Sequence, residues 1–124
     1  MSRAWLAVLL AGCTAHAPSF TRGDFERHIE FLASPALQGR DNDTDGGRRA
    51  AQYVADQLKA AGCEPAVNGG WFHEFETKWV QSSEKTFRGR NVAGGVRGRA
   101  LPNEYVVVGA HFDARGTVKG RIQP

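Results

Sequence analysis

The feature that most constrains the fold is the run Glu-Tyr-Val-Val-Val-Gly-Ala-His-Phe-Asp at positions 104–113. Each residue from Tyr105 to Val108 is apolar, whereas a strand with one face in water would alternate apolar and polar residues. The run therefore predicts a strand covered on both faces, as in the parallel or mixed sheets of α/β proteins. Such sheets carry their chemistry just past the carboxyl ends of their strands, where His111 and Asp113 stand.

His111 and Asp113 form a candidate metal-site pair. The imidazole of His111 is a common metal ligand, and Asp113 is close enough in sequence to ligate beside it or to accept its other ring N–H. An N–H bond to a carboxylate fixes the tautomer and makes the ligating nitrogen more basic. The alternative is a loop histidine followed by a helix-capping aspartate, and the pair alone does not separate the two interpretations.

The amino terminus has the pattern of a bacterial export signal. Arg3 precedes a short apolar stretch, and the sequence Leu-Ala-Gly-Cys at positions 10–13 resembles a lipobox, in which the cysteine is lipidated. The pattern predicts a lipoprotein-type signal peptide over residues 1–12, a tether over 13–22 and the folded part over 23–124. A lipid on Cys13 would anchor the exported protein to a membrane without spanning it. An ordinary signal peptide with an incidental cysteine is the alternative.

The expected location is the periplasmic side of a bacterial membrane, and Thr14 favours the outer membrane because it is not an aspartate-type retention signal. Cys63 is the only other cysteine, and it is expected to be an inert, partly buried thiol. The net charge of +3 is modest. Arginines and glycines cluster over residues 88–99 but lack interleaved aromatic residues, which excludes nucleic acid as the expected partner.

Two amphipathic helices are expected near the start of the folded part. One covers residues 24–33, and the other has an apolar face formed by Ala50, Ala51, Val54, Leu58 and Ala61. The loop between them contains Asp-x-Asp-x-Asp-Gly at positions 41–46, which matches the first half of an EF-hand calcium loop. Gln52 stands where that loop requires a glutamate and Arg48 where it requires an apolar residue, so an acidic helix N-terminus is predicted instead.

Strands are expected after the second helix. Apolar and polar residues alternate over 71–79, which predicts a half-buried strand of antiparallel type, and residues 91–96 predict another strand. His73 shares the parity of the apolar residues, and His28 lies on the first amphipathic helix. Both histidines are assigned to the core or its rim and not to a metal site.

Several motifs, in this order, resemble the M28 zinc peptidases. They are Leu-Ala-Ser-Pro-Ala-Leu-Gln-Gly-Arg at 32–40, Ala-Ala-Gln-Tyr-Val at 50–54, Leu-Lys-Ala-Ala-Gly at 58–62, Arg-Asn-Val-Ala-Gly at 90–94 and Tyr-Val-Val-Val-Gly-Ala-His-Phe-Asp at 105–113. The resemblance implies the amino-terminal part of a three-layer αβα zinc-peptidase fold with a mixed, mostly parallel sheet. It implies an aminopeptidase that hydrolyses peptides with a free amino terminus by means of water activated by two zinc ions.

By the same resemblance, His111 matches the first zinc ligand and Asp113 the carboxylate that orients it. The bridging carboxylate, the catalytic glutamate and the remaining ligands of the family have no counterparts in this sequence. We therefore expect an amino-terminal fragment that is inactive as it stands and holds zinc weakly or not at all, because a catalytic zinc normally needs three protein ligands. Ala114 departs from the histidine found there in many members of the lipoprotein-like branch.

Other M28 activities, carboxypeptidase action and glutaminyl cyclisation, stay open at this stage. A second class of function is also compatible with the sequence: a small lipid-anchored envelope protein that binds a partner or ligand without catalysis. Such a protein would fold independently over residues 20–124 and unfold cooperatively. The sequence predicts no oligomeric state.

Overall fold

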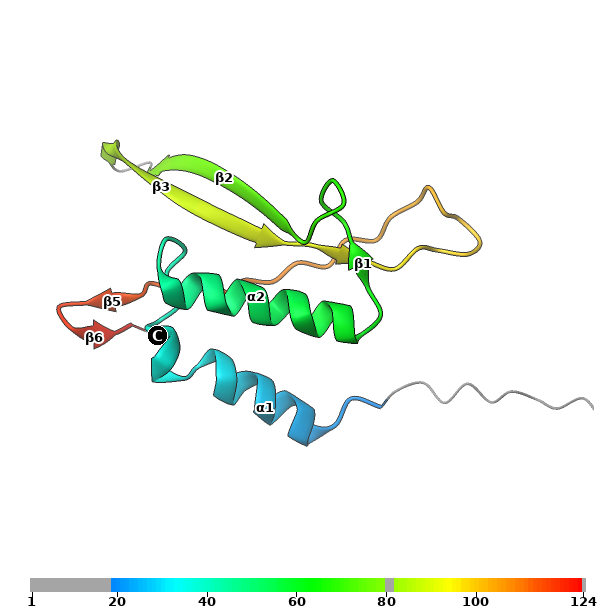
Figure 1. The fold of residues 1–124 in the computed structure, drawn as a ribbon, viewed down its shortest axis with the longest axis horizontal. Helices are drawn as coiled ribbons and strands as arrows, with labels where there is room; N and C mark the ends of the chain where they lie inside the picture. The colour runs from blue at the N-terminus through cyan, green and yellow to red at the C-terminus, as the bar shows by residue number, and fades with distance from the viewer. Residues whose placement is uncertain (1–18, 80–81, 124) are drawn as a thin grey trace, which may run out of the picture.

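The computed structural model describes residues 19–79 and 82–123 of the chain (Figure 1). The predicted signal peptide over residues 1–12 and the predicted lipidation site Cys13 lie outside the described residues. Of the predicted tether over 13–22, only the part from residue 19 is described.

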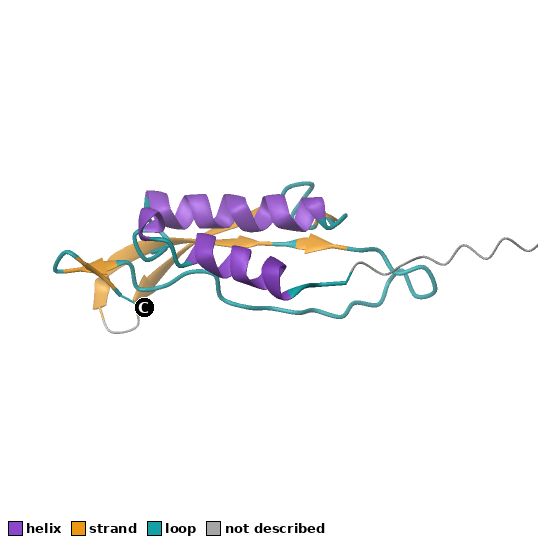
Figure 2. Cartoon of the chain, turned by 90° about the horizontal axis from the view of Figure 1, so that it is seen from below, coloured by secondary structure: helices purple, strands orange, loops and turns teal. Residues whose placement is uncertain are grey.

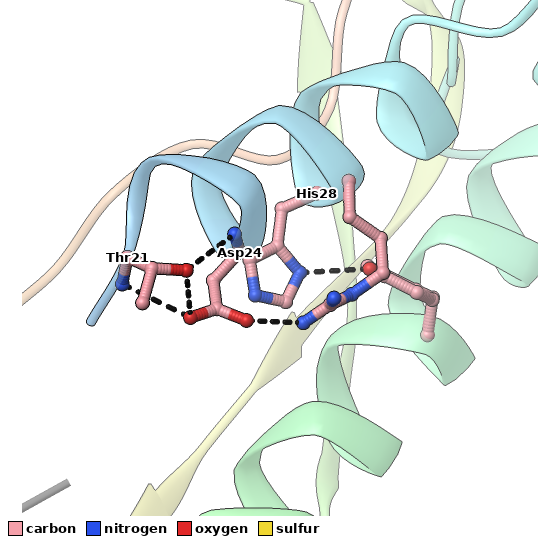
Figure 3. A network of polar contacts seen from close by, with 5 residues as sticks. Thr21, Asp24 and His28 are labelled. Carbon is pink, nitrogen blue, oxygen red and sulfur yellow. Dashed lines mark hydrogen bonds and ion pairs between the residues drawn. The ribbon is translucent and has the colours of Figure 1, made fainter. Parts of the chain in front are cut away.

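Helix α1 spans Arg22–Leu32 and begins with a capping box. The hydroxyl of Thr21 accepts a hydrogen bond from the backbone N–H of Asp24, and the Asp24 carboxylate accepts one from the backbone N–H of Thr21 at 3.0 Å (Figure 3). Hydrogen bonds from the Thr21 hydroxyl, from its backbone N–H and from Arg27 lower the pKa of Asp24 to about 2. The helix expected over residues 24–33 is therefore confirmed, and its capping box explains where it starts.

A 3-10 helix, η1, spans Pro35–Leu37 and leads through a short loop into α2, Asp45–Ala60. Thr44 caps α2 by accepting a hydrogen bond from the backbone N–H of Gly47 at 3.1 Å. Gly62, just past the end of α2, has a φ of +83°, the left-handed conformation that glycine adopts most easily at a helix terminus. The second predicted helix and its acidic N-terminus are confirmed.

The buried hydrophobic core of the described residues is small and lies where η1 packs on α2. It consists of Leu37, Ala50, Ala51 and Ala55. The alanines allow close approach because each side chain is only one methyl group.

Helix α1 packs on α2 through aromatic contacts. The rings of Phe31 and Tyr53 stack with centroids 4.0 Å apart, and Nδ1 of His28 lies 2.7 Å from the Tyr53 hydroxyl. No residue of α1 is fully buried, and Phe25 and Ile29 are about half exposed, at 55% and 50%. The histidine expected at the rim is thus partly buried and hydrogen-bonded, while the apolar face of α1 is only partly covered.

Strands β2, Phe72–Trp79, and β3, Ser82–Val92, form an antiparallel hairpin. Phe75 stands opposite Gly89 in the register, and its ring occupies the space that a side chain at Gly89 would fill. On the other face, Arg88 pairs with Glu76 at 2.8 Å, and a second cross-strand pair joins Arg90 to Glu74. The predicted antiparallel strand is confirmed, but the arginine-rich segment belongs to its partner strand, which the sequence analysis did not predict.

Two short antiparallel pairs complete the described structure. Strand β1, Glu64–Pro65, pairs with β4, Gly94–Gly95, and β5, Thr117–Val118, pairs with β6, Arg121–Ile122. The strand expected over residues 91–96 is therefore divided between the end of β3 and the short β4. In the view of Figure 1, helix α2 lies between the β2–β3 hairpin and α1. In the view from below, both helices lie in front of the hairpin (Figure 2).

The buried strand predicted over residues 104–109 is not present as a strand. The segment between β4 and β5 runs as a long loop, and Tyr105, Val106, Val107 and Val108 are 85–95% exposed. The prediction was wrong because a strand forms only with a hydrogen-bonded partner. Within the described residues, no strand lies in register beside this segment.

The outcome for the fold class is mixed. Helices and strands are both present, as expected of an α/β chain, but all strand pairs among residues 19–79 and 82–123 are antiparallel. The mostly parallel sheet was expected around the 104–109 segment, and that segment is unpaired within the described structure.

Candidate functional site

His111 and Asp113 meet at the end of the exposed segment, in one of the arrangements that the sequence left open. Nδ1 of His111 lies 2.9 Å from Oδ1 of Asp113. Because an ionised carboxylate can only accept, the shared hydrogen belongs to Nδ1, and in the neutral imidazole Nε2 then keeps its lone pair. The His111 side chain is 94% exposed, so this second nitrogen is open to an incoming ligand.

The other oxygen of Asp113 has a partner from a distant part of the chain. The side-chain amide of Asn42 donates to Oδ2 of Asp113 at 2.7 Å. Partial burial by itself raises the pKa of Asp113, but hydrogen bonds from His111, from Asn42 and from its own backbone N–H together outweigh burial and lower this pKa. Asp113 is therefore held as a carboxylate with one oxygen for each partner.

Arg40 holds the backbone on both sides of Asp113. Its Nε donates to the carbonyl of Phe112 at 2.7 Å, and its own carbonyl accepts from the backbone N–H of Ala114 at 3.2 Å. A second guanidinium nitrogen donates to the carbonyl of Leu32 at the end of α1. One arginine in the loop before α2 thus connects α1, this loop and the His111–Asp113 turn.

The same loop also approaches the chain beyond Asp113 at backbone distance. The backbone N–H of Gly116 donates to the carbonyl of Gly39 at 3.1 Å, and a Cβ on Gly39 would stand 2.5 Å from the carbonyl oxygen of Gly116. Both glycines have positive φ, +74° and +72°, so a side chain at either position would be strained as well as crowded.

A cavity of about 480 Å³ opens beside this turn. It lies between the loop before α2 and the β2–β3 hairpin, and Phe112 contributes to its wall. Its lining is largely charged and includes Asp43, Arg48, Glu74, Glu76, Arg88 and Arg90. The pKa of Arg88 is raised, mainly by its hydrogen bond to Glu76, so the two side chains face the cavity as a charged pair.

The remaining candidate residues lie away from this turn. Cys63 is a partly buried free thiol, as expected. His73 stacks on Phe75 with centroids 5.9 Å apart, but it is exposed and does not belong to the core. Across the part of the chain that the structure describes, no group of three histidine, cysteine or acidic side chains could hold a metal ion. His111 and Asp113 are thus a pair and not a closed metal site.

Sequence reasoning missed Asn42 and Arg40. Asn42 lies within the Asp-rich motif at 41–46, whose acidic residues suggested a calcium loop, and Arg40 ends the motif at 32–40 that carries the family resemblance. Both residues stand more than seventy positions from the turn that they contact, with sequence separations of 71 and 72. Only Gly39, beside Arg40, hinted at a close backbone approach to this part of the chain.

No helix within the described residues has both the length and the apolar character needed to span a bilayer.

Comparisons of the chain with family models, with curated proteins and with solved structures gave no match.

Proposed function

We propose that this chain is the amino-terminal part of an exported, M28-type zinc aminopeptidase, in which His111 is a zinc ligand and Asp113 orients it. The observation that carries the proposal is the 2.9 Å contact between Nδ1 of His111 and Oδ1 of Asp113. This is the arrangement in which a metal-binding histidine donates its second ring N–H to a carboxylate. The high exposure of His111 supports it, because Nε2 is accessible for coordination.

The imidazole of His111, with Asp113 as its carboxylate partner, fits zinc as one of its ligands. A neutral imidazole is a common zinc ligand, and a catalytic zinc takes three protein ligands and leaves one position open. The described residues supply one such ligand with its orienting carboxylate, so in this proposal the remaining ligands come from polypeptide beyond residue 124. Two zinc ions, when bound, would polarise the scissile carbonyl and lower the pKa of a bound water.

The finer fold belongs to the same proposal. In a three-layer αβα arrangement with a mixed, mostly parallel sheet, the segment Tyr105–Gly109 would be a central strand. Its support is the exposure of its apolar side chains, 85–95% for residues 105–108, because such surface is normally covered in a soluble domain. The small core formed by η1 and α2 agrees with a domain that is not finished by these residues.

Location and substrate are proposed from the sequence. Residues 1–12 would be removed as a signal peptide, and a lipid on Cys13 would hold the enzyme on the periplasmic side of a bacterial membrane, with the outer membrane favoured. The substrate would be a peptide with a free amino terminus.

Sequencing the source DNA beyond codon 124 is the first test. We expect the reading frame to continue and to encode acidic residues and a histidine able to complete a two-zinc site, including a Gly-x-x-Asp-Asn motif. A stop codon directly after codon 124 would contradict the proposal.

Metal analysis is the second test. The purified 124-residue chain is expected to retain far less than one zinc per molecule, and the longer polypeptide about two. His111→Ala in the longer polypeptide should lower its zinc content, whereas His73→Ala, which alters a histidine on the hairpin, should not. Stoichiometric zinc in the 124-residue chain, or an unchanged content in His111→Ala, would refute the assignment.

The cavity of about 480 Å³ favours one further candidate, a lipid-anchored envelope protein that binds a small polar ligand without catalysis. Its volume falls in the range of small-molecule sites, and its lining offers charges of both signs. That function requires residues 20–124 to fold alone. A single cooperative thermal transition of this segment would favour it, and a broad transition without cooperativity would exclude it.

A further inference from the structure

We propose that Asn42 is a positioning residue for His111, acting through Asp113. Its side-chain amide engages Oδ2 of Asp113, so that Oδ1 faces Nδ1 of His111 and the imidazole is held as the Nδ1–H tautomer with Nε2 free. The importance of that tautomer for zinc depends on the function proposed above, but the tautomer itself does not.

The contact geometry supports this chain of three residues. Nδ2 of Asn42 lies 2.7 Å from Oδ2 of Asp113, and Nδ1 of His111 lies 2.9 Å from Oδ1. A carboxylate that accepts one hydrogen bond on each oxygen has its plane fixed by the two donors. Without the Asn42 amide, Asp113 could turn about its terminal torsion, which is broad for aspartate, and the contact to His111 would loosen.

Asn42 is itself held in place by the loop that carries it. The carbonyl of Asp41 accepts hydrogen bonds from the backbone N–H and from the hydroxyl of Thr44, at 3.1 and 2.7 Å. Thr44 in turn caps α2. A Cβ on Gly47 would collide with the Asp41 carbonyl oxygen, so the first turn of α2 packs directly against the backbone beside Asn42.

The Asp113 turn is tied to the same loop independently of Asn42. Arg40 binds the backbone at Phe112 and Ala114, and Gly39 accepts from Gly116. Backbone contacts on both sides of Asp113 fix its distance from the loop. The Asn42 amide is therefore held within hydrogen-bond distance of Oδ2. This separates two roles: Arg40 joins the backbones, and Asn42 sets the orientation of one carboxylate.

The tautomer of His111 can be read directly by NMR in the full 124-residue chain labelled with 15N-histidine. At pH 8, where an ordinary imidazole is neutral, the two ring nitrogens have distinct shifts in each tautomer. The chain has four histidines, and the His111 signals are identified by their loss in His111→Gln. The wild-type chain is expected to show a His111 ring biased to Nδ1–H.

Asn42→Leu removes the donor at similar size, and Asn42→Asp keeps the shape but places a second carboxylate against Asp113. Both are expected to lower the Nδ1–H fraction of His111 by about twofold or more, as Asp113→Ala should also do. Asp43→Asn changes the neighbouring loop residue and is expected to leave the tautomer unaltered. The helical signal in far-UV circular dichroism establishes whether each variant is folded. If Asn42→Leu does not fold, Asn42→Asp provides the test.

If Asp113→Ala changes the tautomer but both folded Asn42 variants retain the wild-type value, Asn42 has no positioning role and the inference is overturned. An unbiased ring in the wild-type chain would overturn it as well. Failure of the zinc proposal leaves these readings unaffected, because the measurement contains no metal, so the two results can be told apart.

Discussion

Two loops of this chain differ in how closely the rest of the structure packs against them. The loop that joins η1 to α2 is rich in Asp and Gly. Its aspartates are exposed, while Leu37, Gly39, Gly46 and Gly47, which lie in or beside it, are buried. The loop between β4 and β5 contains the most apolar run of the folded part, yet residues 105–108 are 85–95% exposed. The backbone of the first loop bonds to the chain around residues 112–116, whereas residues 105–108 of the second have no strand partner within the described residues. An apolar sequence therefore does not ensure burial unless another part of the fold covers it.

The largest expected effect on stability comes from Gly46, where the loop region is packed most tightly. A Cβ on Gly46 would overlap the carbonyl of Leu37, a backbone atom that cannot swing aside. Gly46→Ala should therefore lower the free energy of unfolding by more than about 4 kcal/mol or prevent folding, as measured by urea denaturation. Gly95→Ala is the matched control, since nothing lies within 4 Å of a Cβ there, and it should cost less than about 1 kcal/mol. Equal effects of the two changes would contradict the packing described.

Truncating one apolar side chain in each region gives the next largest effect. Leu37 is fully buried, so Leu37→Ala should cost about 2–5 kcal/mol in the same denaturation experiment. Val107 is 89% exposed, so Val107→Ala should change the free energy of unfolding by no more than about 0.5 kcal/mol. A large cost for Val107→Ala would mean that the apolar loop is covered in solution, and the comparison between the loops would fail.

Hydrogen exchange sharpens the comparison without a mutation. Backbone amides of Val106, Val107 and Val108 should exchange at nearly the rate of an unstructured peptide, because they have no strand partner in the described structure. Amides of Ala50–Ala55 in α2 should be slower by about 100-fold or more. Similar protection in both segments would place a partner on the apolar run.

The smallest effect concerns a polar contact that belongs to neither loop. The pKa of Asp24 is lowered from 3.8 to about 2 by its bonds to Thr21 and Arg27, so its contribution to stability is complete above about pH 4 and is lost as the pH falls toward 2. NMR titration of its carboxyl carbon should show the low value in the wild-type chain. In Thr21→Val the pKa should move back toward 3.8, and an unchanged value would exclude the capping box as the cause.

The local elements could be predicted from the sequence because their partners are near in sequence. Thr21 and Asp24 cap α1 from three positions apart, the alanine face of α2 follows its own helical period, and alternation marks β2. Strand β3 was missed because its arginines and glycines do not have the composition of a typical strand. They are accommodated because Glu74 and Glu76 pair with the arginines and Phe75 covers Gly89.

The candidate site divides in the same way. The sequence by itself placed His111 and Asp113 at i and i+2, close enough for their side chains to meet, but did not determine that they do. Only the tertiary structure decided that Asn42 completes the arrangement, across 71 positions, and that Arg40 ties the backbone on both sides of Asp113. It also decided that residues 105–108 stay exposed. Their apolar side chains favour burial in a sheet, but the strand that would pair with them must come from another part of the fold.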